Sequence, residues 1–157
     1  MPPQTQNDSL VGENALLSRR YIESAAFENS ARIKRLKIRK DYNFFSIGSS
    51  SNDIFLFPLP AGAEIISCWV NVVVAFAGLA SCSVSVGPDT NESGVLSGNS
   101  VIAIGIKTIK GADFVDNRAI YSLTVPTTIQ ARMTGSANLN GLTAGVIDFY
   151  FIYLEHL

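Results

Sequence analysis

The fold is decided by residues 65–76, IISCWVNVVVAF, in the middle of the chain. The run is rich in β-branched residues and apolar on both faces over much of its length. That pattern is typical of a strand at the centre of a β-sandwich, or of one covered by a second subunit. The wider apolar stretch, 65–80, is shorter than the about 20 residues that a membrane-spanning helix needs, and Asn71 and Gly78 interrupt it. We therefore expect no membrane association.

Comparable runs lie on both sides of this stretch, separated by clusters of Gly, Pro, Asn, Asp and Ser. The expected strands are 35–46, 53–59, 64–77, 80–87, 100–108, 119–125, 128–134 and 145–155. Polar loops are expected at 87–100 and 107–118. So many short strands without helices between them predict a mainly β protein, an antiparallel β-sandwich of jelly-roll type, with a barrel as the alternative.

The length of 157 residues suits one such domain with an N-terminal arm. Within the arm, residues 13–27 place apolar side chains at helical spacing and predict a short amphipathic helix. We place the arm at 1–31 and the β-sandwich domain at 32–157. The N-terminus has neither the basic nor the apolar region of a secretory signal, so we expect the chain to stay where it is made.

Charge is divided unevenly along the chain. Residues 1–40 carry eight basic and four acidic side chains, whereas residues 41–157 carry four basic and nine acidic ones. A basic N-terminal region that precedes an acidic body is expected to meet a negatively charged surface. In residues 32–40, Leu36 and Ile38 alternate with basic residues, which favours a strand with one basic, solvated face over a basic helix.

This region supplies the candidate partner-binding residues. They are Leu16, Leu17, Arg19, Arg20, Tyr21, Phe27, Arg32, Lys34, Arg35, Lys37, Arg39 and Lys40. Nucleic acid is one possible partner, because Lys and Arg neutralise phosphates. The sequence pI near 5.8 and the lack of an aromatic-basic stacking pattern favour a protein surface instead.

Nothing in the sequence assembles a convincing catalytic or metal site. The single histidine, His156, stands next to last in the chain. Cys68 and Cys82 each lie in an apolar run without a metal-ligand spacing, so we expect buried free thiols. We therefore expect no catalytic residues, no metal and no cofactor.

The remaining candidates for chemistry are carboxylates and one tryptophan. The carboxylates Asp89, Glu92, Asp113 and Asp116 are the only candidates for a glycan hydrolase. A calcium site from Asp89, Asn91 and Glu92 does not match the EF-hand spacing. Trp69 suggests either sugar stacking or, preferably, a core or subunit-interface position.

Several segments carry a resemblance to a known class. Residues 58–66, PLPAGAEII, open a valine-rich strand ending at Phe76, and a serine-valine strand ends at Gly87. The chain ends in an aromatic and aliphatic strand, 144–154. Across roughly residues 54–155 these patterns resemble small β-sandwich virion proteins of tailed bacteriophages, of the head decoration or cement type.

The resemblance implies a jelly-roll-like body, often a homotrimer, that projects from a capsid and is anchored by its N-terminal segment. The expected function is non-enzymatic: to decorate and stabilise a phage capsid by binding the major capsid protein. The location would be the capsid surface of the virion, after assembly in the host cytoplasm. One alternative is a tail or head-fibre module that binds host surface carbohydrate through loops 87–100 and 107–118. The hydrolase is the other alternative.

Overall fold

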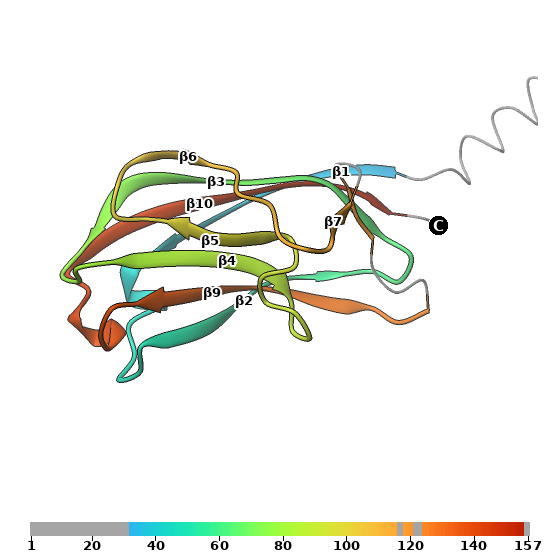
Figure 1. Cartoon of the computed structure of the whole chain (residues 1–157). Coiled ribbons are helices and arrows are strands. Elements are labelled where there is room, and N and C mark those ends of the chain that lie inside the picture. The colour runs from blue at the N-terminus through green and yellow to red at the C-terminus, as the bar shows by residue number, and fades with distance from the viewer. Residues whose placement is uncertain (1–31, 116–117, 121–123, 156–157) are drawn as a thin grey trace, which may run out of the picture. The chain divides into compact units, whose positions relative to one another are not determined.

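The computed structural model describes residues 32–115, 118–120 and 124–155. These residues form two antiparallel β-sheets (Figure 1). Their strands are β1 (Arg32–Asp41), β2 (Ser51–Leu59), β3 (Glu64–Ala77), β4 (Cys82–Pro88), β5 (Leu96–Ser100), β6 (Gly105–Lys107), β7 (Phe114–Val115), β8 (Arg118–Ile120), β9 (Thr127–Gly135) and β10 (Ala144–Glu155). Two short 3-10 turns, η1 (Tyr42–Phe44) and η2 (Leu139–Gly141), complete the described elements. The sheets belong to one compact unit, Ile33–Glu155.

The strand order is that of a jelly roll. Sheet A has the order β1-β10-β3-β8-β7, with β6 also paired to β3, and sheet B has the order β2-β9-β4-β5. β1 and β3 belong to sheet A and β2 and β4 to sheet B, so the chain crosses between the sheets after each of the first three strands. β9 then lies between β2 and β4 in sheet B, and β10 lies between β1 and β3 in sheet A. The predicted β-sandwich of jelly-roll type is therefore confirmed, and the barrel alternative is wrong because the strands form two separate sheets.

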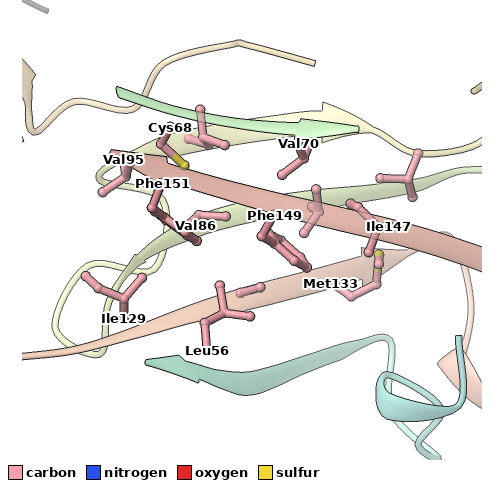
Figure 2. Packing of buried hydrophobic residues seen from close by; sticks show 14 of the residues in the cluster. Leu56, Cys68, Val70, Val86, Val95, Ile129, Met133, Ile147, Phe149 and Phe151 are labelled. Atoms are coloured by element: carbon pink, nitrogen blue, oxygen red, sulfur yellow. The ribbon is translucent and has the colours of Figure 1, made fainter. Parts of the chain in front are cut away.

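The core lies between the two sheets (Figure 2). Sheet A contributes alternate residues of β3 and β10, among them Val70, Val72, Ile147, Phe149 and Phe151. Sheet B contributes residues such as Val84, Val86, Ile129 and Met133. The Phe57 ring packs edge-on against that of Phe151, with ring centroids 4.8 Å apart. Each large side chain buried in this way contributes about 1.5–3 kcal/mol to stability.

Both cysteines are free and buried, as predicted. Burial raises the pKa of Cys82 to about 11 and raises that of Cys68 further still. The thiols therefore stay protonated at neutral pH and behave as small apolar side chains.

The first strand ends earlier than predicted, at Asp41 instead of residue 46. The Asp41 carboxylate accepts a hydrogen bond from the Asn43 backbone N–H at 2.9 Å and so caps the turn η1. The turn buries Phe45, whose ring packs edge-on against Phe76 at 5.9 Å. Core packing thus overrides the alternation that continued through Phe44.

Three predicted segments differ in detail. The expected loop 87–100 contains β5. Within the expected strand 100–108, Ser100 belongs to β5 and pairs with Ser83, and Gly105–Lys107 form β6, where Gly105 has a φ of 115°. The expected strand 119–125 is represented by β8, which pairs with β7. β5 was not predicted because its sequence is mostly polar. Its Asn99 is buried at a position where an apolar residue would have indicated a strand.

Candidate functional site

The strand β1 forms an outer edge of sheet A within the part of the chain that the structure describes. Its half-buried residues Leu36 and Ile38 pack against the core, so Arg35, Lys37 and Arg39 lie on the opposite, outer face of the sheet. The predicted strand with one basic face is therefore confirmed. This row of three cations, Arg35, Lys37 and Arg39, is called the basic row below.

One buried carboxylate lies beside the basic row. Asp148 of β10 lies opposite Asn71 of β3, and only 1% of its surface is exposed. Arg39 donates two hydrogen bonds to it, from Nε to Oδ1 at 2.7 Å and from Nη2 to Oδ2 at 2.8 Å. The ammonium of Lys37 lies 3.1 Å from Oδ2. The hydrogen bonds from Arg39 outweigh the desolvation and lower the pKa of Asp148.

The same outer face carries a stack of side chains. Tyr150 and Trp69 are paired residues of β10 and β3, and their rings are parallel within 5° at a centroid distance of 5.1 Å. The Lys37 ammonium lies 5.4 Å from the centroid of the Tyr150 ring. The Lys37 ammonium, the Tyr150 phenol and the Trp69 indole thus lie in a row across β1, β10 and β3. Ring stacking and the attraction between the cation and the Tyr150 ring stabilise this row.

A shallow hollow of about 460 Å³ opens next to this stack. Its walls come from three neighbouring strands and comprise Arg35, Leu36, Lys37, Trp69, Tyr150, Phe151 and Ile152. Aromatic and aliphatic groups dominate the lining, while Arg35 and Lys37 add positive charge. We call this feature the aromatic hollow. Trp69 is therefore half-buried on the outer face, not between the sheets.

Apolar side chains are also exposed where the chain runs along β6. Ile102, Ile104, Ile106 and Ile109 are 44%, 68%, 66% and 60% exposed. Ile106 lies opposite Asn71 in the β3–β6 pairing, on the outer side of sheet A. Val73 and Val74 of β3 are exposed as well. The outer face of β3 that appeared covered in the sequence is therefore open here, and we call the four isoleucines the isoleucine edge.

The carboxylates considered for catalysis have structural roles or stand apart. Glu92 lies 2.8 Å from Arg132, which also forms a bidentate ion pair with Asp53. Asp113 accepts a hydrogen bond from the side chain of Asn91 at 3.1 Å. Asp89 is exposed, and Asp116 lies outside the described residues. Within the described residues, no three His, Cys, Asp or Glu side chains gather as metal ligands would.

The remaining candidate partner-binding residues divide into two groups. Lys34 pairs with Glu155 at 3.4 Å, Lys40 lies over the Phe44 ring at 4.2 Å, and Arg32 is exposed. The candidates of the arm, Leu16, Leu17, Arg19, Arg20, Tyr21 and Phe27, lie outside the described residues, as does His156. The boundary between residues 31 and 32 accordingly stays a prediction. Among the described helical turns, none is long and apolar enough to cross a membrane.

Sequence reasoning missed both the aromatic hollow and the isoleucine edge. The hollow depends on the register of β10 against β3, which brings Tyr150 beside Trp69. The isoleucine edge had a visible signal, because Ile102, Ile104 and Ile106 alternate with residues that supply little apolar surface. An apolar row with no second apolar row to pack on indicates a surface for another molecule.

Comparisons with known proteins find this fold in a chain of a solved phage capsid structure. No protein-family profile and no curated protein sequence matches the chain. Among solved structures, a chain of the Cyanophage Pam1 capsid asymmetric unit matches with a TM-score of 0.54 and 14% identity, over 80% of this chain and 86% of that one. A chain of the acidic stable capsid structure of Helicobacter pylori bacteriophage KHP30 matches with a TM-score of 0.44 and 14% identity, over 81% and 94%. At 14% identity, the Pam1 likeness shows a shared fold.

Proposed function

We propose that the chain is a structural, non-enzymatic virion protein of a tailed bacteriophage, which decorates the capsid and stabilises it by binding the major capsid protein. The proposal rests mainly on what the outer face of sheet A exposes. The basic row lies on β1, the aromatic hollow lies beside it, and the isoleucine edge runs along β6. Exposed apolar patches rimmed by polar residues mark interaction surfaces, and protein interfaces are enriched in aromatic residues and arginine. The jelly-roll fold shared with a chain of a cyanophage capsid supports the virion location.

The two parts of this face suit two kinds of contact. The basic row would dock on an acidic surface of the shell, and the apolar residues of the arm at 1–31 would serve as anchors. The isoleucine edge would join copies of the chain, and a homotrimer is the assembly we propose. A protein that binds only the assembled shell stabilises it by mass action, because disassembly must first release the bound protein.

Shell binding tests the proposal directly. Shells of the phage that encodes the chain, prepared without it, are mixed with the purified full chain, sedimented and heated. The proposal expects co-sedimentation and a higher temperature of shell disruption. Shells that neither bind the chain nor gain stability would refute it.

The role of the arm needs its own variant. A chain that begins at Arg32 keeps the whole of β1, whose Leu36 and Ile38 pack on the core. We expect it to retain its β-sheet circular dichroism spectrum and to lose shell binding. Full binding by this variant would show that the anchor lies in the β-sandwich, and decoration itself would stand.

One observation favours a second candidate, the fibre module that binds host carbohydrate. The parallel Trp69–Tyr150 pair beside a hollow is the kind of surface on which sugar rings stack. The loop carboxylates Glu92 and Asp113 support it less, because both are engaged within the chain. A glycan array with the full chain and Trp69→Ala discriminates: hits lost in the variant favour carbohydrate binding, and an absence of hits counts against it.

A further inference from the structure

We infer that the open edge of β1 and the aromatic hollow beside it bind one extended, acidic segment of the shell protein, which joins sheet A as an additional strand. The inference rests on the proposed function, and it names the chemistry that the chain recognises in the shell. Three features support it: the charge of the outer face, the edge of β1 and the aromatic hollow.

The first feature is charge. The basic row places three cations against the single carboxylate of Asp148, which Arg39 and Lys37 already engage. Arg35 forms no ion pair with the described residues, and half or more of the side-chain surface of Lys37 and Arg39 stays exposed. The row thus keeps an excess of positive charge that an acidic partner complements.

The second feature is the geometry of β1. Within the described residues it is a strand of 10 residues at the end of sheet A, and every one of them is exposed or half-buried. The backbone groups on the free edge of such a strand can pair with an added strand. Cations at every second residue repeat at about 6.6 Å, which is also the spacing of same-face side chains on an added strand. Acidic side chains at alternate positions would therefore each meet the basic row.

The third feature is the aromatic hollow. It lies on the same outer face, between Arg35 and Lys37 on one side and Trp69 on the other. An apolar or aromatic side chain on the same face of the bound segment as its carboxylates would fill it, with a carboxylate two residues away lying against Arg35. The free backbone edge favours a polypeptide over a glycan, since a sugar chain lacks the regular amide groups that pair with a strand.

Peptide binding to the full chain tests the inference. The probe is a fluorescent peptide as long as β1, with glutamate at alternate positions and valine or leucine between them. One central glutamate is replaced by phenylalanine, so that its ring lies on the glutamate face and can enter the hollow. One control peptide carries lysine in place of glutamate, and a second carries N-methyl groups on the amides that would pair with β1. We expect the acidic peptide to bind, the lysine peptide not to bind, and the methylated peptide to bind about tenfold more weakly.

Variants locate the site on the chain. Arg35→Gln removes a charge without touching the Arg39–Asp148 pair, and should weaken peptide binding about threefold to tenfold. Trp69→Ala should weaken it about tenfold by emptying one wall of the hollow. Lys107→Gln removes the same charge from β6 and should leave the affinity unchanged. Equal weakening by Arg35→Gln and Lys107→Gln would indicate general charge attraction and overturn the inference.

Competition with shells separates this inference from the proposed function. The acidic peptide should displace the full chain from shells, and Arg35→Gln should bind shells more weakly than the unchanged chain. Shell binding that neither the peptide nor Arg35→Gln affects would overturn the inference and leave decoration intact.

Two other outcomes concern the occupant of the site. A chain that binds no shells would refute the proposed function and, with it, the shell protein as occupant. Binding of an anionic glycan that is lost in Trp69→Ala, without peptide binding, would overturn the inference in favour of carbohydrate.

Discussion

Arg39 and Asp148 are 109 residues apart in the sequence and form a bidentate ion pair on the outer face of sheet A. The carboxylate is buried, whereas the guanidinium keeps 57% of its side-chain surface exposed. The pair joins the edge strand β1 to β10 and neutralises part of the basic row. One carboxylate therefore joins β1 to β10 in addition to their backbone pairing, and it offsets part of the surface charge.

The pH dependence of stability should show this pair. The pKa of Asp148 is lowered from its ordinary value of 3.8, chiefly by the hydrogen bonds from Arg39. The folded state thus binds its proton later than the unfolded state as pH falls. The stabilisation is present in full above the unfolded-state pKa and is lost as pH falls through the folded-state pKa.

Chemical denaturation of the unchanged chain and Asp148→Asn, from pH 7 down to pH 2, measures the effect. The variant should be less stable at neutral pH, and the difference in free energy of unfolding should shrink below about pH 4. Repeating the series at high salt should reduce the difference only in part, because the carboxylate is buried. Parallel curves across the whole range would show that Asp148 contributes nothing to the acid sensitivity.

Asn99 should be the most costly polar side chain to remove from β5. Its Oδ1 accepts a hydrogen bond from the Ile109 backbone N–H at 2.9 Å, and its Nδ2 donates to the Ile109 carbonyl at 3.1 Å. Asn99→Ala leaves the Ile109 N–H without this partner, while the Ile109 carbonyl still accepts a hydrogen bond from the Ser97 N–H at 3.0 Å. The variant should lower the free energy of unfolding by about 1–3 kcal/mol. Asn140→Ala, which alters an exposed side chain, should change it by less than about 0.5 kcal/mol. Equal effects in urea denaturation would contradict a special role for Asn99.

Gly145 marks the bulge at which β10 begins its pairing with β3. Its φ is 144°, and an added Cβ would lie 2.5 Å from ring atoms of Phe76. Gly145→Ala should destabilise the protein by about 1–3 kcal/mol, because the buried ring must move and the backbone is strained. Gly48→Ala is the matched control, since an added Cβ meets nothing within 4 Å there. If thermal unfolding of the two variants coincides, the close approach of Gly145 to Phe76 is unimportant.

The sequence predicted the long strands because their patterns are local. β3 and β10 bury one set of alternate residues whatever their partners are, so runs such as 65–76 identify strands without knowledge of the register. β5 escaped prediction because Asn99 and Gly98 stand where apolar residues would mark a strand. Its place is fixed by pairing with β4 and by hydrogen bonds to Ile109, which are contacts between separate segments.

The candidate site divides in the same way. Alternation in residues 32–40 predicted the basic row, since the pattern of a strand alone places Arg35, Lys37 and Arg39 on one face. The partner of that row, Asp148, and the pairing of Trp69 with Tyr150 depend on which strands become neighbours and in which register. Local patterns contain no such information, because a shift of one residue would turn Tyr150 to the other face of the sheet.

The isoleucine edge should hold copies of the chain together. Burying an exposed isoleucine contributes about 1.5–3 kcal/mol, whereas burying a lysine ammonium without a partner is costly. We expect the full chain to have the mass of a trimer in light scattering, and Ile104→Lys and Ile106→Lys to have the mass of a monomer. Val125→Lys is the control, because Val125 is also 60% exposed but lies near the start of β9. A trimer that persists in both isoleucine variants would place the subunit interface elsewhere, and a monomeric unchanged chain would refute the trimer. Monomeric variants should also bind shells more weakly than the trimer, since the trimer engages the shell at several sites at once.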